Sequence, residues 1–595
     1  MYYGHIFRTL GILAILLIVS PQVSAQAPEY PPGRDEWSGM GANYYNTRWA
    51  SDNEVINSTT VPKVTQHCKI TYPIGVSATP VIQNTTVYYP TWNGSFVALD
   101  YTTCKVVWQI DVGKIISQFG ALSPVQLNAT LPVSRTSPQI DGNVMYFGTQ
   151  SNALLVAVDL ATGATLATIQ INPHPLAVIT ISPTVYKDTI FVGTSSQEEV
   201  GAEYPGYECC SCIGNFMAVT FDPKAKKFTT KWTFEALPAN EGWAGAGIWG
   251  SQAPIDPNLN QVFVATGNLY IYPAEYEHCE NQTSSCLPDG IWQESVVALD
   301  IDTGKVNWGN RVSPLDGFTM ACYTANASPL CNTGPATDAD FAMMPVFIPA
   351  SLSGLKGDTV VIGQKSGNLY SFAAKDGSLI WGSKTSPNSD WGGLSWGIAC
   401  DNAQVYFTAI NYGKFAWNIQ PSNVQITNSA FGSANLLTGD IVWETQVPQN
   451  NLAYAPPSVV GDIVLVSRAG LNAVGSLMAL SKTTGAVLLD WPTDSTMRGG
   501  VAIQDQYLLF GTGYDYGAGT FTSGSLYVLM GPIAPPSRVD TQGLEGTSSV
   551  SSPSPAGPTK APKKNWAGKL TPLYTSCLHV ALPVVILLLG EIGML

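Results

Sequence analysis

The stretch VVALDIDTGKVNW, residues 296–308, decides the fold of this chain. Its first half alternates apolar and polar residues as a half-buried β-strand does, and Asp302-Thr303-Gly304 has the composition of a tight turn. Val306 to Trp308 then begins a second strand that ends on a large aromatic residue. The stretch therefore predicts a β-hairpin.

The same hairpin pattern recurs along the chain. Ungapped copies lie at residues 98–108, 157–167, 371–381, 433–443 and 479–489, and a stretched copy lies at 218–232. Each is accompanied by a pattern of two more strands, and residues 498–511 with 526–529 form an eighth unit that lacks its last strand. About eight four-stranded units predict an all-β fold, an eight-bladed β-propeller of antiparallel blades. Residues 35–50 are the expected donor of the missing strand.

The composition changes at both ends of the chain. Residues 1–25 combine a weakly positive start, a short apolar core and a Val23-Ser24-Ala25 cleavage pattern, which predicts a secretory signal. The propeller is expected over 26–531, and 532–568 is Ser/Pro/Lys-rich, which predicts a disordered linker. Residues 569–595 resemble a glycolipid (GPI) anchor signal, which would hold the protein at the outer cell surface. A short membrane anchor is the alternative.

Cysteines and glycosylation sequons favour the same compartment. The chain has 11 cysteines, of which Cys577 lies in the apolar tail. Cys68 with Cys104, Cys279 with Cys286 and Cys322 with Cys331 are the expected local disulfides of an oxidising environment. N-x-S/T sequons, which predict a glycoprotein, begin at Asn57, Asn84, Asn93, Asn128, Asn281 and Asn326.

Charge limits the partners of the chain. Only 12% of its residues are charged, and the net charge is -14. An acidic chain without basic clusters argues against nucleic acid as a partner.

Unusual polar residues interrupt the repeats at four places, where a propeller would hold a ligand in its central channel. Two adjacent carboxylates follow an apolar strand in FVGTSSQEE (191–199), and Asn268 ends WGSQAPIDPNLNQVFVATGN (249–268). TDADFAMM (337–344) has two Asp residues among apolar ones, and GQKSGNLY (363–370) has a lone lysine. Carboxylate and amide oxygens suit calcium, and a further carboxylate can act as a base.

The repeats resemble the A-x-D-x-x-T-G-x-x-x-W docking motifs of pyrroloquinoline quinone (PQQ)-dependent alcohol dehydrogenases. The Cys209-Cys210 pair, the TGN ending at Asn268 and the D-x-D-F run at residues 338–341 resemble the polyvinyl-alcohol-dehydrogenase-like subgroup. This resemblance, which covers about residues 35–530, implies PQQ and calcium as cofactors.

The resemblance also implies roles for individual residues. It implies that Glu198, Asn268 and Asp340 bind calcium and that Asp340 is also the catalytic base. Glu199 is the alternative to Glu198, and Asp338 the alternative base. The cofactor-binding residues that it implies are Trp249, which stacks on the quinone, Lys365, Thr180, Arg135, Ser395 of the Ser395-Trp396 pair, and the Cys209-Cys210 pair as a disulfide over the cofactor. The two cysteines could instead bond separately to Cys212 and Cys400.

The implied activity is oxidation of a small or polymeric alcohol to an aldehyde or ketone. No C-x-x-C-H motif occurs in the sequence, which excludes a covalently attached c-type haem, so electrons would pass to an external acceptor. The alternatives are a non-catalytic propeller that acts as a scaffold and a surface protein that binds glycans or polymers.

Overall fold

The computed structural model describes residues 37–204, 206–323, 338–388, 392–469, 474–514, 516–517 and 520–532. The predicted signal (1–25), the linker beyond residue 532 and the anchor signal (569–595) lie outside these ranges, as do Asn326, Cys331 and Cys577. Within the described ranges, no helix is both long and apolar enough to cross a bilayer.

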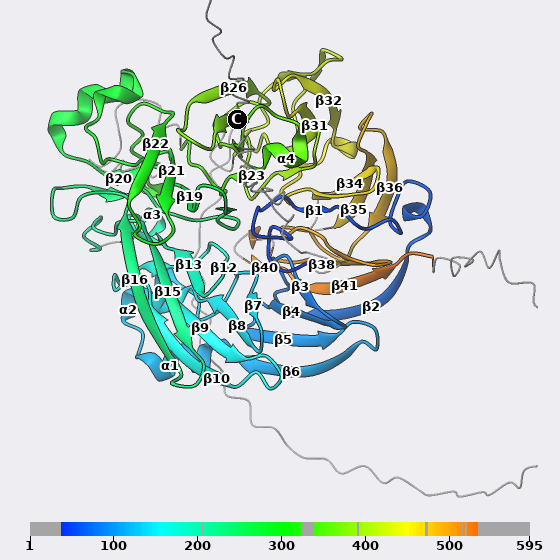
Figure 1. The fold of residues 1–595 in the computed structure, drawn as a ribbon, viewed down its shortest axis with the longest axis horizontal. Helices are drawn as coiled ribbons and strands as arrows, with labels where there is room; N and C mark the ends of the chain where they lie inside the picture. Colours follow the sequence, from blue (N-terminus) through cyan, green and yellow to red (C-terminus); the bar gives the residue numbers. More distant parts are fainter. Residues whose placement is uncertain are drawn as a thin grey trace, which may run out of the picture.

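Eight blades, each with four antiparallel strands, surround a common centre, and one of them carries β1 as a fifth strand, which confirms the predicted propeller (Figure 1). The first four blades are β3 (Val81–Gln83), β4 (Thr86–Pro90), β5 (Ser95–Asp100) and β6 (Lys105–Asp111); β7 (Gln139–Asp141), β8 (Val144–Gly148), β9 (Leu154–Asp159) and β10 (Thr165–Gln170); β12 (Thr184–Tyr186), β13 (Thr189–Gly193), β15 (Asn215–Asp222) and β16 (Lys227–Glu235); and β18 (Ile255–Asp256), β19 (Gln261–Ala265), β21 (Ser295–Asp300) and β22 (Val306–Arg311). The last four are β23 (Val346–Ile348), β24 (Thr359–Gly363), β25 (Asn368–Ala373) and β26 (Leu379–Lys384); β27 (Ala399–Cys400), β28 (Gln404–Ala409), β31 (Ala430–Asn435) and β32 (Ile441–Gln446); β33 (Ser458–Val460), β34 (Ile463–Ala469), β35 (Gly475–Ser481) and β36 (Val487–Pro492); and β37 (Ala502–Gln504), β38 (Tyr507–Gly511), β41 (Gly524–Met530) and β2 (Thr65–Tyr72).

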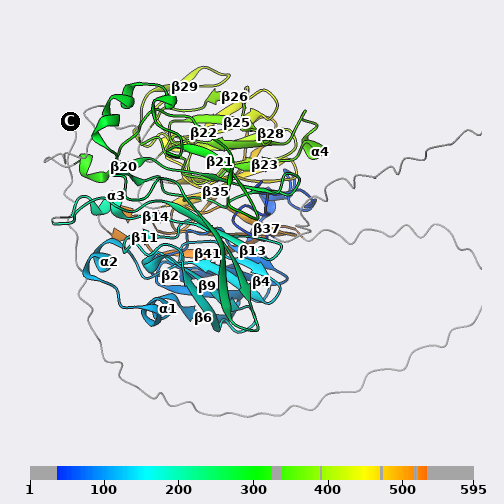
Figure 2. The ribbon, with the colours of Figure 1, turned by 60° about the vertical axis from the view of Figure 1, so that its left-hand side comes forward.

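Shorter elements decorate the blades. The remaining strands are β1 (Trp49–Ala50), β11 (Ala177–Val178), β14 (Ser195–Ser196), β17 (Ala244–Gly245), β20 (Leu269–Ile271), β29 (Trp417–Ile419), β30 (Val424–Ile426), β39 (Tyr516–Gly517) and β40 (Thr520–Phe521). The helices are α1 (Val112–Phe119), α2 (Pro124–Ala129), α3 (Glu198–Gly201) and α4 (Ala350–Ser353), and the 3₁₀ turns are η1 (Val61–Lys63), η2 (Ser151–Ala153), η3 (Ala274–Asn281), η4 (Ser284–Cys286), η5 (Met320–Tyr323) and η6 (Pro448–Asn450). Figure 2 shows α2, α3 and β20 on the same side of the ring.

The ring closes differently from the prediction. The last blade takes its outer strand from β2, which pairs antiparallel with β41, and not from residues 35–50. Within the latter stretch, β1 adds to the inner edge of the seventh blade, parallel to β33. Cys68 and Tyr72 of β2 are buried, and they contact the first blade through the Cys68–Cys104 disulfide and a 2.7 Å hydrogen bond between the Tyr72 and Tyr89 hydroxyls.

Neighbouring blades are joined by the tryptophans of the repeat. The indole Nε1 of Trp232 donates to the Ile301 carbonyl of the next blade (2.8 Å), and its ring covers Gly304, where a Cβ would lie 2.6 Å from ring atoms. Gly304 also has φ +70°, so this turn requires glycine on both counts. The same indole-to-carbonyl bond occurs at Trp108, Trp308, Trp381 and Trp443. The docking role predicted from the repeats is thus confirmed.

The structure contains the disulfides Cys68–Cys104, Cys209–Cys210 and Cys279–Cys286, all of them predicted. Cys322 is also disulfide-bonded, while its expected partner Cys331 lies outside the described residues. Cys212 and Cys400 are buried free thiols, so the alternative pairing with Cys209 and Cys210 is wrong.

A buried carboxyl group on β32 makes stability depend on pH. Glu444 Oε2 accepts a hydrogen bond from Gln420 N beside the β29–β30 hairpin, while Oε1 has no partner among the described residues. Burial raises its pKa from 4.5 to about 8, although the Gln420 bond opposes the shift. Because the folded state binds this proton more tightly than the unfolded chain, the free energy of unfolding falls as pH rises from about 4.5 to 8.

Glu444→Gln is therefore expected to stabilise the protein at pH 8.5 by a few kcal/mol and to leave it unchanged near pH 4, where the unfolded chain also binds the proton. Thermal unfolding at both pH values, with exposed Glu277→Gln as the control, measures the difference. Equal melting temperatures of wild type and Glu444→Gln at pH 8.5 would show that burial does not destabilise the ionised carboxylate.

Candidate active site

A cavity of about 290 Å³ lies at the centre of the ring, and five of the ten predicted site residues line it. Its wall includes Arg135, Thr180, Trp249, Lys365 and Ser395. A second cavity of about 210 Å³ shares Arg135, Thr180 and Trp396 with the first and adds Arg498 and Tyr514. Residues from distant blades therefore converge on one central site.

Lys365 is the electrostatic centre of this site. Its Nζ lies 2.8 Å from Asp338 Oδ1 and 3.0 Å from Asp340 Oδ2, and all three side chains are buried. Burial alone would lower the pKa of Lys365, but attraction to Asp338, Asp340 and Glu199 outweighs it and raises the pKa well above the usual value. Lys365 is therefore a permanent cation here. It also lies 5.3 Å from the centroid of the Trp249 ring.

Asp340 and Asn268 are directly connected. Asp340 Oδ1 accepts a 2.5 Å hydrogen bond from Asn268 N, and a Cβ on Gly267 would lie 2.4 Å from this oxygen. The Asn268 side-chain nitrogen donates to the carbonyls of Leu269 and Phe318, which fixes the amide. The Asn268 Oδ1 atom accepts no hydrogen bond within the described residues, so it is available as a ligand atom.

Glu198 and Glu199 diverge, although they are neighbours on α3. Glu199 lines the central cavity, and burial raises its pKa to about 7, with Lys365 opposing the shift and Asp340 adding to it. Glu198 is fully buried outside that cavity, and its carboxylate accepts hydrogen bonds from Ser211 N (3.0 Å), Cys212 N (2.6 Å) and Tyr207 Oη (2.7 Å). Glu198 therefore does not line the cavity, and its oxygens bind the loop that follows it.

The loop that Glu198 holds includes the Cys209–Cys210 disulfide. Cys209 Sγ lies 3.7 Å from the Glu198 carbonyl oxygen, and His174 Nε2 lies 3.4 Å from Glu198 Oε1. Neither cysteine is among the residues that line the central cavity. Glu198 thus anchors the disulfide loop beside the site, while Glu199 faces into it.

Several polar groups of the cavity wall lack the partners that folded proteins normally provide. Thr180 Oγ1 and Ser395 Oγ are buried without a hydrogen bond in the described structure. Arg135 forms no ion pair or hydrogen bond there, and its guanidinium lies 5.4 Å from the Trp396 ring centroid. Burial lowers the pKa of Arg135, and nearby Arg498 lowers it further, while Tyr514 opposes both effects. These groups fit an anionic ligand with several acceptor oxygens.

Two contributors to the cavities escaped the sequence analysis. Arg498 lies 4.0 Å over the ring of Tyr454, and Tyr514 stacks on Trp92 with ring centroids 3.5 Å apart. The only signal in the sequence was a lone arginine before Gly499-Gly500 in a weakly charged region.

Known proteins resemble this chain in sequence and in fold. The sequence model of the PQQ_2 family, described as "Outer membrane protein assembly factor BamB", matches residues 46–203 and 293–488. The chain belongs to this PQQ-repeat family. As a PQQ-repeat protein it has curated relatives that are dehydrogenases. It is 30% identical over 384 residues to a polyvinylalcohol dehydrogenase of Pseudomonas sp, covering 62% of this chain and 54% of that protein.

Further relatives and a solved structure extend the comparison. The chain is 25% identical to quinohemoprotein alcohol dehydrogenase ADH IIB of Pseudomonas putida, covering 62% of this chain and 51% of that protein. The crystal structure of the quinohemoprotein alcohol dehydrogenase from Comamonas testosteroni superimposes with a TM-score of 0.62 at 17% identity, covering 86% of this chain and 83% of that one. The chain spans about half the length of the curated relatives it matches. The resemblance drawn from the repeats is confirmed.

Proposed function

We propose that this protein is a PQQ- and calcium-dependent oxidoreductase that oxidises an alcohol to an aldehyde or ketone and passes the electrons to an external acceptor. The observation that carries the proposal is the buried group of Lys365, Asp338 and Asp340, which lies beside Trp249 and Glu199 in the central cavity. Burying so many charges is costly unless a ligand uses them. The polyvinylalcohol dehydrogenase relative favours an alcohol as the substrate, small or polymeric.

The unpaired polar groups of the cavity suit PQQ, a flat quinone that bears carboxylates. Arg135 would bind a carboxylate, and the Thr180 and Ser395 hydroxyls would donate to further oxygens. Trp249 offers a flat wall beside Lys365, so it would keep the ring in register. When bound, PQQ supplies the carbonyl carbon that accepts a hydride from the alcohol.

Calcium prefers oxygen ligands, and we assign it to Glu199 of the cavity wall together with Asp340, which contacts Lys365 of that wall, and Asn268 Oδ1. A bound calcium would supply Lewis-acid polarisation of the quinone. We assign this role to Glu199 in place of Glu198, because the oxygens of Glu198 already accept hydrogen bonds from the 207–212 loop.

The residues of the chain would manage the proton of the reaction. The alcohol loses a hydride and a proton, and Asp340 is the group we assign to accept the proton. Lys365 Nζ lies 3.0 Å from Asp340 Oδ2, and the Asn268 N–H donates to Asp340 Oδ1, so the two contacts fix the orientation of the Asp340 side chain. Because these side chains are buried, the proton transfer is shielded from solvent.

We also propose that the protein acts outside the cytoplasm, held by a C-terminal lipid anchor. The disulfides among the described residues support an oxidising compartment. The predicted signal at 1–25 and the sequons support export.

Glu199→Gln and Glu198→Gln form a matched pair that tests the calcium assignment. Glu199→Gln is expected to raise the calcium concentration needed for half-maximal alcohol oxidation by about 100-fold, since it removes one charged ligand from the cation. Glu198→Gln is expected to lower the melting temperature and to leave the calcium requirement near that of the wild type. Activity with a dye acceptor over a calcium series measures the first effect, and thermal unfolding the second.

An equal calcium requirement in Glu199→Gln and wild type would contradict the assignment. A wild-type protein that binds PQQ but oxidises no alcohol from a panel of primary, secondary and polymeric alcohols would favour the non-catalytic propeller.

A further inference from the structure

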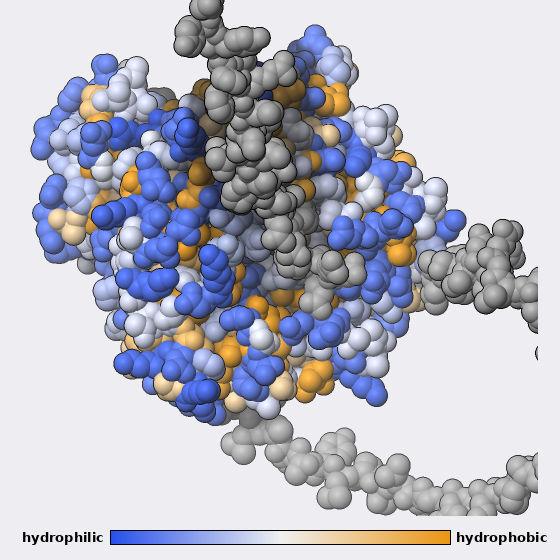
Figure 3. Space-filling view, viewed as in Figure 1, coloured by the Kyte–Doolittle hydropathy of each residue, from blue (hydrophilic) through white to orange (hydrophobic). Residues whose placement is uncertain are grey.

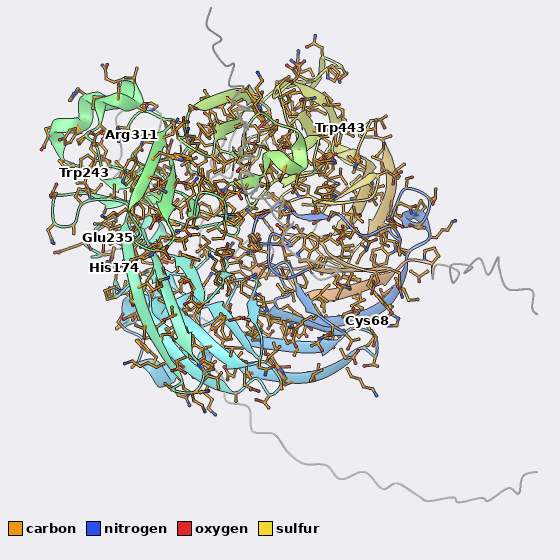
Figure 4. The ribbon with its side chains drawn as sticks, in the orientation of Figure 1. Cys68, His174, Glu235, Trp243, Arg311 and Trp443 are labelled. Atoms are coloured by element: carbon orange, nitrogen blue, oxygen red, sulfur yellow. A yellow bond between two sulfur atoms is a disulfide. The ribbon has the colours of Figure 1, made fainter. Side chains whose placement is uncertain are left out.

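A separate cavity of about 470 Å³ lies on the outer rim of the propeller, where the end of β16 meets the chain before β17 and the loop after η4. Figure 4 labels Glu235, Trp243 and Arg311 on this side, away from the centre of the ring. Figure 3 shows a largely hydrophilic surface along the same rim. The cavity shares no lining residue with the central site. Its chemically informative wall residues are Trp243, Tyr276, Trp292, Glu235, Glu241 and Asp289.

The walls of this rim cavity are fixed before any ligand binds. Arg311 donates hydrogen bonds to the carbonyls of Ser284 (2.8 Å), Leu287 (2.8 Å), Pro288 (3.2 Å) and Ile291 (2.6 Å), so it holds the whole loop. The Cys279–Cys286 disulfide closes the adjoining turn. The Trp292 ring rests on Gly309 of β22, where a Cβ would lie 2.2 Å from the indole. A preformed pocket reduces the entropy cost of binding.

The rim cavity offers a buried donor without a partner. Trp243 is 94% buried, yet its indole Nε1–H donates no hydrogen bond to any described residue. The docking tryptophans, such as Trp232, all bond a carbonyl with this group. The Trp243 Nε1 atom is not fully shielded from solvent, so a ligand in the cavity can reach it.

Hydrogen-bond acceptors and flat aromatic faces line the rim cavity together with the Trp243 N–H group. The carboxylates of Glu235 and Glu241 form no hydrogen bond or ion pair with described residues, and both residues are exposed at the cavity wall. The rings of Trp243 and Tyr276 lie with centroids 5.1 Å apart at an interplanar angle of 39°. Half-buried Trp292 contributes a third aromatic face.

We propose that the rim cavity binds a neutral polyhydroxylated ligand, a sugar residue of an oligosaccharide chain. A hydroxyl group both donates and accepts, so sugar hydroxyls can satisfy the carboxylates and the Trp243 N–H together. The C–H face of a sugar ring packs on aromatic rings. An organic cation would leave the indole N–H unpaired, and an anion would be repelled by Glu235 and Glu241. The proposal does not rest on the quinone reaction.

To test the proposal, the full-length protein is titrated with cellohexaose, mannohexaose and maltohexaose. Calorimetry and tryptophan fluorescence measure the binding. At least one oligosaccharide is expected to bind the wild type. Tyr276→Ala removes an aromatic face and Trp243→Phe removes the N–H while keeping most of the ring, and each is expected to weaken binding by about tenfold. Phe415→Ala, which changes an exposed aromatic residue outside the cavity, is the matched control and should bind as the wild type does.

The proposal is overturned if none of the three oligosaccharides binds, or if Tyr276→Ala and Trp243→Phe both bind like the wild type. Binding of tetramethylammonium in place of the sugars, lost in Glu241→Gln, would also overturn it and identify a site for organic cations. PQQ binding by the same variants is expected to match the wild type. Failure of the rim-cavity proposal can thus be distinguished from failure of the proposed quinone site.

Discussion

Asp340→Asn is expected to lower kcat for PQQ-dependent alcohol oxidation by about 10²- to 10⁴-fold, because the amide cannot accept the alcohol proton. The substitution keeps the shape of the side chain and an oxygen that can accept the hydrogen bond from Asn268 N. Lys365 then loses one of its two carboxylate partners, so some loss of stability should accompany the loss of rate. Steady-state kinetics with a dye acceptor at saturating calcium and PQQ measures the effect.

Asp338→Asn is the matched comparison, since Asp338 Oδ1 contacts the same Lys365 Nζ at 2.8 Å. It should disturb the ion pair to a similar extent and retain most of the activity. If Asp338→Asn loses the activity while Asp340→Asn keeps it, Asp338 is the base.

Arg135→Ala is expected to weaken PQQ binding by about 100-fold or more, because a carboxylate of the cofactor loses its charged partner. The same variant should leave the PQQ-free protein as stable as the wild type, or more stable. Arg135 has no ion-pair partner among the described residues, and desolvation already lowers its pKa, so the folded apo state gains little from it. Calorimetric titration with PQQ and thermal unfolding without it give the two values.

Arg468→Ala controls for loss of an arginine outside the central site, since Arg468 pairs with Asp490 on the seventh blade. A variant Arg135→Ala that unfolds at a much lower temperature without PQQ would show that the residue serves the fold and not the ligand.

The repeating part of the fold could be predicted because its signal is local. Each hairpin, such as β21–β22, places its turn and its tryptophan at fixed spacings within one short stretch. Ring closure could not be predicted in the same way. β2 and β41 are separated by most of the chain, and no turn residue between them fixes the pairing. Trp49 and Ala50, which form β1 within the predicted donor stretch, instead pair with the seventh blade.

The candidate site, like the fold, could be predicted from the sequence only in part. The sequence placed Trp249 and Asn268 in one blade and Asp340 and Lys365 in the next, and the propeller brings them together. It could not distinguish Glu198 from Glu199, because the choice depends on where the backbone N–H groups of Ser211 and Cys212 lie. Such contacts across a loop leave no periodic pattern in the sequence. Arg498 escaped prediction for the same reason, since only the folded ring brings it near Arg135.

Calorimetric titration of the purified full-length protein with PQQ, in the presence of calcium and again in EDTA, tests the central claim most directly. The account predicts one equivalent of PQQ bound with calcium present and much weaker binding in EDTA. Absence of PQQ binding at saturating calcium would contradict it and leave the buried charges of Lys365, Asp338 and Asp340 without the ligand assigned to them.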